Sequence, residues 1–139
     1  MDIFAVNWLA VVLAALAGFV VGGIWYGPLL GKRWMAAIGM TEDDMENVHK
    51  SDGLVKIYGS TFLLSLVASW TLAHVFATYP DLAFNIMVLT AFGVALGFVV
   101  PALWTNYLFQ GSNRSLFLID GGYWLLFYTA MGLVHAAFA

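Results

Sequence analysis

The side chains with the greatest potential for chemistry in this chain stand in otherwise apolar surroundings. Asn106 and Gln110 are four residues apart, so they share one face of a helix, and Asp120 and Tyr123 follow at a comparable depth in the next apolar stretch. An Asp at the centre of a membrane helix costs about 2.5 to 3.5 kcal/mol. Two interpretations of Asp120 therefore stay open: stabilisation of a helix N-terminus, and contact with a substrate, a proton or an ion.

Two histidines form a second candidate site. His74 and His135 each lie close to the end of an apolar stretch, so both are expected at a similar depth on the same side of a membrane. The axial ligands of a haem, or two ligands of a metal ion, require such a placement. Interfacial placement of an amphipathic ring explains the same positions. No cofactor is predicted, and haem is the alternative.

The composition excludes several classes of function. The 139 residues contain no cysteine, which rules out disulfides, thiolate metal sites and cysteine nucleophiles. No glycine-rich phosphate loop occurs, and no Ser, His and Asp share a plausible depth, so the sequence predicts no enzyme. A net charge of -3 argues against a nucleic-acid partner, which would need a basic surface.

Four long apolar stretches must position these groups. Hydrophobic residues make up 63% of the chain and charged residues only 9%, against roughly 25% in globular proteins, so a soluble fold is excluded. A membrane helix needs about 20 predominantly apolar residues. We predict one all-α, four-helix transmembrane domain over residues 1–139, with spans at about 3–26, 57–77, 84–108 and 116–138.

The basic residues predict the orientation of these spans. The five Lys and Arg residues flank or occupy the first and third connections: Lys32, Arg33, Lys50, Lys56 and Arg114. By the positive-inside rule, both connections face the cytoplasm and both termini face outward. The second connection is a tight turn on the outer side, so the second and third helices are antiparallel neighbours.

The first connection, residues 31–53, is the longest polar segment. Thr41 and Asp44 have the spacing of a capping box, in which each side chain bonds the other residue's backbone N–H, and this predicts a short helix over 42–50. Consecutive acidic residues point around such a helix, which favours a solvated acidic face over a divalent-cation site.

Small residues predict where the helices pack. Ala14, Gly18 and Gly22 recur every four residues in the first span, and Gly93 and Gly97 do so in the third. Helices in lipid associate through such close approach of their backbones. The two stripes serve packing within the bundle or, alternatively, contact with a second copy or with other membrane subunits.

The two halves of the chain share a plan. When His74 is aligned with His135, two leucine pairs also match, and Trp25 in the first span corresponds to Trp104 in the third. This pattern is compatible with a parallel duplication of a two-helix hairpin. Pro101 is expected to kink the third span near its middle, because proline lacks the N–H that continues the helix.

Aromatic and basic residues at the end of the first span are predicted to contact lipid. Trp25, Tyr26 and Trp34 are expected anchors at the membrane interface. Lys32 and Arg33 are expected to meet anionic headgroups on the cytoplasmic side. Membrane lipids are therefore predicted partners.

Three segments resemble a known family. Residues 23–35, GIWYGPLLGKRWM, and the segments 101–109, PALWTNYLF, and 120–124, DGGYW, are similar to the small bacterial membrane proteins grouped as domain of unknown function 1761. The resemblance covers nearly the whole chain. It implies a four-helix, multi-pass protein of the bacterial cytoplasmic (inner) membrane and no established activity.

The sequence favours an accessory or interaction subunit that acts by transmembrane helix packing within a larger membrane complex. High apolarity without a charge at mid-membrane supports this interpretation. One alternative is a small transporter or channel whose pathway passes Asn106, Gln110 and Asp120. A second alternative is a redox subunit that binds haem through His74 and His135.

Overall fold

The fold is built from helices. The computed structural model describes residues 2–50 and 53–139. In these residues the elements are α1 (Trp8–Ile24), the π-helical turn η1 (Trp25–Leu29), α2 (Gly31–Ile38), α3 (Glu42–Lys50), α4 (Gly53–Ala77), α5 (Phe84–Val94), the π-helical turn η2 (Ala95–Val99), α6 (Val100–Gln110) and α7 (Arg114–Ala137). Four segments are long and apolar enough to cross a membrane: Trp8–Leu29, Gly53–Ala77, Phe84–Gln110 and Arg114–Ala137. The predicted four-span all-α fold is confirmed.

The first span begins later than predicted. Helix α1 starts at Trp8 because the Asn7 side chain accepts a hydrogen bond from the Ala10 N–H at 3.2 Å, the bond of an N-cap. Asn7, a polar residue of the predicted span, is therefore its cap. The other three spans keep their predicted places, with ends shifted by at most four residues.

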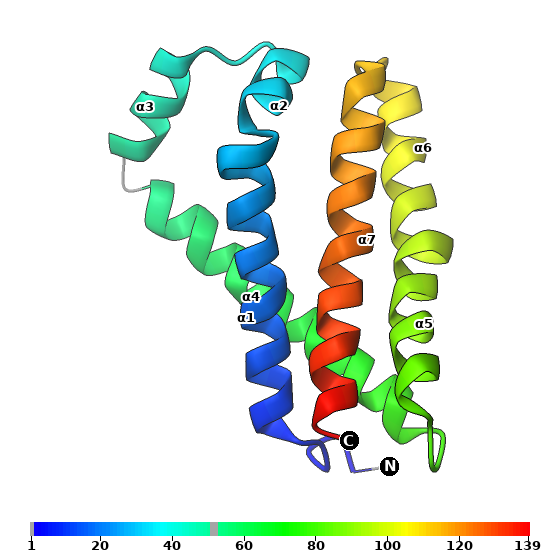
Figure 1. The fold of residues 1–139 in the computed structure, drawn as a ribbon. Coiled ribbons are helices and arrows are strands. Elements are labelled where there is room, and N and C mark those ends of the chain that lie inside the picture. The colour runs from blue at the N-terminus through cyan, green and yellow to red at the C-terminus, as the bar shows by residue number, and fades with distance from the viewer. Residues whose placement is uncertain (1, 51–52) are drawn as a thin grey trace.

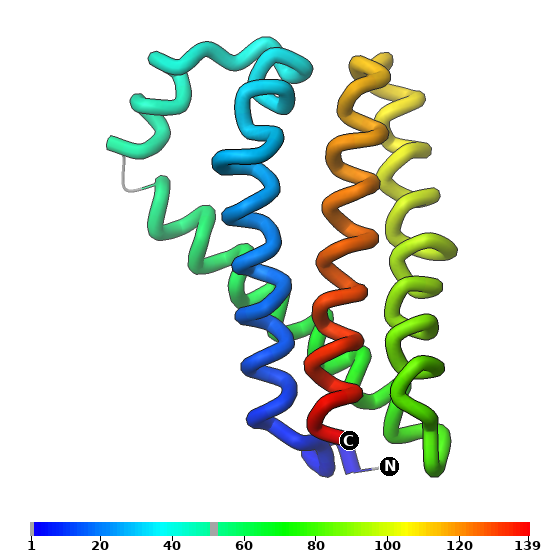
Figure 2. Tube along the Cα trace, in the orientation of Figure 1, coloured from blue at the N-terminus to red at the C-terminus, as the bar shows by residue number. Residues whose placement is uncertain are grey.

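Helix α7 is the central element. It lies between α1 and the continuous span formed by α5, η2 and α6, and these three spans run side by side (Figure 1). Helix α4 crosses them obliquely and packs mainly on α1, as the backbone trace shows (Figure 2), so the prediction that the second and third spans pack as antiparallel neighbours is wrong. Both ends of the chain lie at the same end of the bundle.

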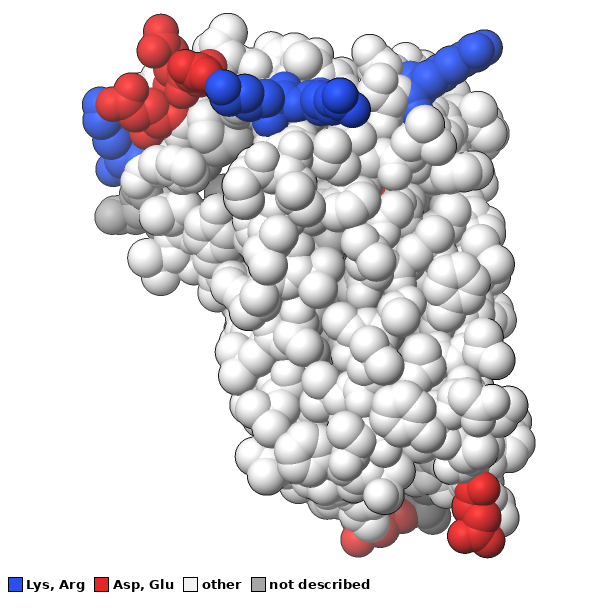
Figure 3. Space-filling model, in the orientation of Figure 1, with Lys and Arg blue, Asp and Glu red and all other residues white. Residues whose placement is uncertain are grey.

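The charged residues distinguish the two ends of the bundle. Figure 3 shows Lys and Arg gathered at the end where α2 and α3 lie, which we call the basic end. The opposite end, which we call the acidic end, carries the start of the chain with Asp2, the turn between α4 and α5 with Asp81, and the C-terminal Ala139. The five basic residues thus share one side, and that this side faces the cytoplasm stays a prediction of the positive-inside rule.

The glycine stripe of the first span packs against α7, as predicted. Ala14 is fully buried, and a Cβ atom on Gly18 would lie 2.5 Å from the Phe127 ring. The stripe of the third span does not pack, because a Cβ on Gly93 or Gly97 would meet nothing within 4 Å. Ala91 and Ala95 are the fully buried small residues of that span. Gly132 of α7 lies against Ala91, and a Cβ added there would come within 2.6 Å of it.

Each of the two π-helical turns adjoins a proline. Pro28 lies within η1, where the Leu30 N–H bonds the Trp25 carbonyl at 2.8 Å, and Pro101 follows η2. Proline supplies no N–H, so the backbone next to it shifts to the wider turn. The predicted irregularity at Pro101 is therefore a π-helical turn just before it.

The short helix predicted in the first connection forms as α3, whereas the helix α2 before it was not predicted, and residues 51–52 of this connection lie outside the described residues. The Thr41 hydroxyl accepts from the Asp44 N–H at 3.2 Å, and the Asp44 carboxylate accepts from the Thr41 N–H at 2.9 Å, which starts α3 at Glu42. The Thr41 N–H and hydroxyl hold the pKa of the Asp44 carboxyl below its usual range. Glu46 and Lys50 form an exposed salt bridge of 2.7 Å one turn apart. The capping box thus holds its helix locally.

Candidate functional site

The buried carboxylate of Asp120 is the centre of the candidate site. Asp120 is 6% exposed and lies in the second turn of α7. The Tyr26 hydroxyl donates to its Oδ1 at 2.5 Å, and the Tyr107 hydroxyl donates to its Oδ2. Asn113 is the N-cap of α7, since its side chain accepts from the Ser115 N–H. The interpretation of Asp120 as a helix-start cap is therefore wrong, and the residue instead joins the first and third spans to the fourth.

Two indole rings flank the carboxylate. Trp25 donates from Nε1 to the carbonyl of Ile119, and Trp104 donates from Nε1 to the carbonyl of Phe117, both at 2.8 Å. Both carbonyls belong to α7: Ile119 lies three residues before Gly122, and Phe117 lies four residues before Gly121. The first and third spans thus each supply one indole and one phenol to the same turns of α7.

The two glycines after Asp120 make this approach possible. A Cβ on Gly121 would lie 3.0 Å from Nε1 of Trp104, and a Cβ on Gly122 would lie 3.0 Å from the Trp25 ring. Both contacts are tighter than side chains normally tolerate, so larger residues would push the indoles away from the helix. The segment Asp120-Gly121-Gly122 therefore combines one acceptor with the space its neighbours need.

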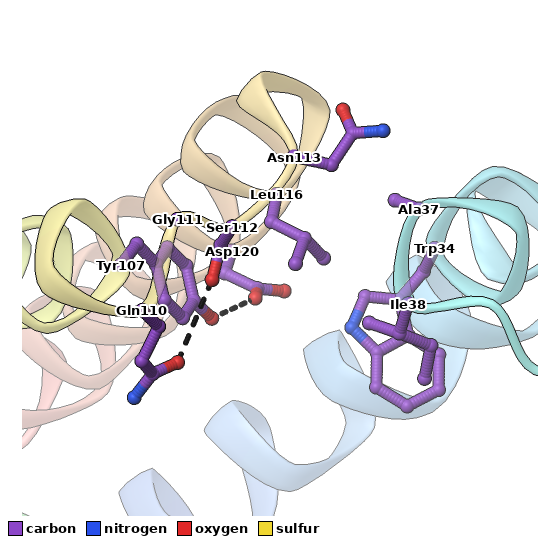
Figure 4. Close-up of a pocket in the computed structure, with 10 residues that line it drawn as sticks. All are labelled: Trp34, Ala37, Ile38, Tyr107, Gln110, Gly111, Ser112, Asn113, Leu116 and Asp120. Carbon is purple, nitrogen blue, oxygen red and sulfur yellow. Dashed lines mark hydrogen bonds between the residues drawn. The ribbon is translucent and has the colours of Figure 1, made fainter.

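A pocket of about 490 Å³ opens beside the carboxylate at the basic end. Figure 4 shows Asp120, Tyr107 and Gln110 on one wall and Trp34 with Ile38 of α2 on the other. The remaining lining residues are Ala37, Gly111, Ser112, Asn113 and Leu116. The Ser112 hydroxyl donates to the Gln110 amide oxygen at 3.5 Å. A carboxylate, an amide and two aromatic rings therefore border one cavity.

The structure brings together part of the predicted polar cluster. Gln110 and Asp120 share the pocket, whereas Asn106 is exposed and is not among the lining residues. Tyr123 is buried behind Asp120, with its ring centroid 5.0 Å from that of Tyr26. Tyr107 takes the place that the sequence assigned to Asn106. It lies three residues before Gln110, and this spacing was the available signal for a shared face.

The predicted lipid anchors have divided roles. Trp25 and Tyr26 are half-buried and bond α7, and Trp34 lines the pocket with its ring centroid 5.7 Å from that of Tyr26. Their place next to the basic connection suggested lipid contact, but η1 and α2 turn them toward the bundle. Lys32 and Arg33 are exposed at the basic end, and their contact with anionic headgroups stays a prediction.

The two histidines have separate partners at the acidic end. Nε2 of His135, which is 5% exposed, lies 3.0 Å from the Ser69 hydroxyl, and that hydroxyl donates to the Val11 carbonyl at 2.8 Å. Nε2 of His74 lies 2.9 Å from the Ile3 carbonyl and therefore donates to it. The His135 imidazole thus ties α7 to α4 through Ser69, and the His74 imidazole ties α4 to Ile3 near the start of the chain. The haem hypothesis for this pair stays a prediction.

The four apolar spans and the buried polar site define a multi-pass membrane protein with a central helix. The chain matches the family model described as Protein of unknown function (DUF1761) over residues 9–136, and it belongs to that family. No curated protein and no solved structure matches it. The matched range contains every residue of the Asp120 site, so this site lies within the family's domain.

Proposed function

We propose that this protein binds a small organic cation in the Asp120 pocket and carries it across the membrane. The observation that supports the proposal is a 6% exposed carboxylate, held by two phenol hydroxyls, beside a pocket of about 490 Å³. Ionisable groups inside a membrane domain are costly, and they are typical of ion and substrate pathways.

Both oxygens of the Asp120 carboxyl group have a hydrogen-bond donor. Tyr26 donates to Oδ1 and Tyr107 donates to Oδ2, so each oxygen is held in a fixed place by one phenol hydroxyl. Among the described residues, no Lys or Arg forms a salt bridge with Asp120. Its carboxyl group therefore meets hydroxyl dipoles from the protein, and a bound cation would supply the opposite charge.

The pocket walls suit an organic cation better than a bare metal ion. The faces of Trp34 and Tyr107 attract alkylammonium groups through cation–π interactions, which strengthen when water is excluded. A metal ion would need several oxygen ligands, and the described residues contain no group of three or more His, Asp or Glu side chains placed to hold one. A pocket of this volume accommodates a small ligand.

A fluorescence titration tests the proposal, because Trp34 lines the pocket. Tetraethylammonium chloride, added to the purified protein, should quench the emission saturably, while sodium chloride at equal ionic strength should not. Asp120→Asn should weaken this binding at least about tenfold, which corresponds to about 1.4 kcal/mol. Asp43→Asn, an exposed substitution of the same kind on α3, is the matched control. Unchanged binding in Asp120→Asn would refute the proposal.

A second candidate is the accessory subunit that the sequence favoured. The observation in its support is the open stripe of Gly93 and Gly97, where an added Cβ would meet nothing within 4 Å. Small residues on an outer helix face allow another helix to approach closely. Purification in mild detergent tests it: wild-type protein should travel with a larger complex that Gly97→Leu dissociates. Wild-type protein that migrates as a single chain would contradict it.

A further inference from the structure

One face of α7 connects the two ends of the bundle. The residues of this face recur every three or four positions and are all buried: Asp120, Tyr123, Phe127, Met131 and His135. Asp120 and His135 are 15 residues apart, a rise of about 22 Å along a helix, against a hydrocarbon core of about 30 Å. The face therefore begins and ends with an ionisable side chain, one near each side of the membrane.

A second pocket, of about 680 Å³, lies at the acidic end of this face. His135 lines it together with the polar residues Asn7, Tyr79 and Asp81, and most of its remaining lining is apolar. The Ser69 hydroxyl donates its hydrogen to the Val11 carbonyl and can only accept from His135. His135 therefore donates to Ser69 from Nε2. A neutral imidazole then has a lone pair on Nδ1, and the pocket lining adds one acidic side chain, Asp81.

Between the two pockets the face is closed by tight apolar packing. Phe127 is 1% exposed and Met131 is 0% exposed. Gly18 of α1 lies under the Phe127 ring, and Gly132 lies against Ala91 of α5, where an added Cβ would come within 2.5 Å and 2.6 Å respectively. Phe127 and Met131 therefore fill the space between the two pockets among the described residues.

We propose that the two pockets are the two ends of one route along this face, that Phe127 and Met131 form its closed gate, and that the His135 pocket receives the same small organic cation. The inference rests on the proposed function of the Asp120 pocket. The distribution of charge would draw a cation toward the acidic end, because that end carries Asp2 and Asp81, whereas the five Lys and Arg residues lie at the basic end. A cation leaving Asp120 meets no positive side chain at the other end.

Cysteine labelling tests the route, because the chain contains no cysteine of its own. Phe127→Cys and Met131→Cys place a thiol in the gate, and Leu126→Cys, on a 45% exposed position of α7, places one toward lipid. The probe is the impermeant cationic reagent trimethylammonioethyl methanethiosulfonate. Only a hydrated thiol ionises and reacts, and opening of the gate would hydrate these two positions, so the gate thiols should react at least about tenfold faster than the lipid-facing thiol. Tetraethylammonium should slow their reaction.

Two results would overturn the route: equal labelling at gate and lipid positions, or gate labelling that tetraethylammonium does not slow. The titration on the same variants separates this failure from failure of the proposed function. Retained tetraethylammonium binding with either result refutes the route alone, whereas absence of binding in the wild-type protein refutes the function itself. Met131→Cys keeps the test decisive if Phe127→Cys does not fold.

Uptake into proteoliposomes tests the receiving role of His135. His135→Gln should slow uptake of labelled tetraethylammonium about tenfold while its binding at the Asp120 pocket stays within about twofold. His74→Gln, which alters an imidazole bonded to Ile3 at the same end, should leave uptake unchanged. Equal uptake in His135→Gln and wild-type protein would contradict the receiving role. Slower uptake together with weaker binding or a loss of folding would also contradict it, because a purely structural residue would have those effects.

Discussion

The two ends of α7 are held by different kinds of interaction. At the basic end, four aromatic donors from the first and third spans bond α7: Trp25, Tyr26, Trp104 and Tyr107. At the acidic end, one buried Ser–His pair accompanies apolar packing around Met131 and Phe76. Hydrogen bonds fix direction and distance, whereas apolar contacts tolerate small shifts. The comparison suggests a basic end built to hold a charge in a defined place and an acidic end able to rearrange.

The layer between the two ends should show the largest effect on stability. Phe127→Ala removes a fully packed ring from the contact between α1 and α7, and a truncation of this size typically costs about 3 to 5 kcal/mol. Leu126→Ala, at a 45% exposed position of the same helix, should cost far less because no packed layer is lost. Unfolding of both variants in detergent measures the difference, and similar losses would break the assignment of Phe127 to a common core.

The glycines of the first and third spans should respond in opposite ways to the same substitution. Gly18→Ala places a methyl group 2.5 Å from the enclosed Phe127 ring, and overpacking of this kind costs about 1 to 3 kcal/mol. Gly97→Ala meets open space and should leave stability equal or slightly raised, since alanine favours the helix. Thermal unfolding of the two single variants checks this order. A larger loss for Gly97→Ala would contradict it.

Substitutions that remove hydrogen bonds should have non-additive effects on stability within the basic end and additive effects between the two ends. Tyr26→Phe and Tyr107→Phe each remove one bond to Asp120, and single hydrogen bonds in membrane proteins are worth about 0.6 kcal/mol on average. Because both hydroxyls share one carboxylate, the double variant should depart from additivity. Ser69→Ala at the acidic end should combine additively with Tyr26→Phe. A double-mutant cycle measures both couplings, and additivity in the tyrosine pair would break the comparison.

Much of this architecture was predictable from sequence, and the site was predictable only in part. Long apolar runs and the Thr41–Asp44 spacing determine spans and a capped helix through local chemistry, so these predictions were confirmed. Asp120 stood out because its charge is costly in lipid. Its partner Tyr26 was assigned to the lipid interface, since the sequence does not reveal the inward turn that η1 and α2 impose. The spacing of glycines likewise does not show whether they point into the bundle or away from it. Gly93 and Gly97 have the spacing of a packing stripe, yet they point into open space.

The smallest expected effect concerns α3, which extends from the basic end and is started by its capping box. The Thr41 N–H and hydroxyl lower the pKa of Asp44 in the folded chain, so the carboxylate stabilises the first turn at pH values above its unfolded pKa. This contribution is lost as the pH falls through the folded pKa. Amide hydrogen exchange of α3, followed from about pH 6 to about pH 3 and corrected for intrinsic rates, should show protection decreasing.

Two matched variants sharpen this last expectation. Asp44→Asn should remove the pH dependence of α3 protection, whereas Asp43→Asn, in the same exposed turn, should retain it. The same pH response in Asp44→Asn and wild-type protein would mean that other carboxylates control the helix. Because α3 is held at its start by this local cap and α7 by buried bonds, protection of the α7 amides near Asp120 should persist while α3 frays. The basic end would then contain one helix held by buried bonds and one held at its start by an exposed cap.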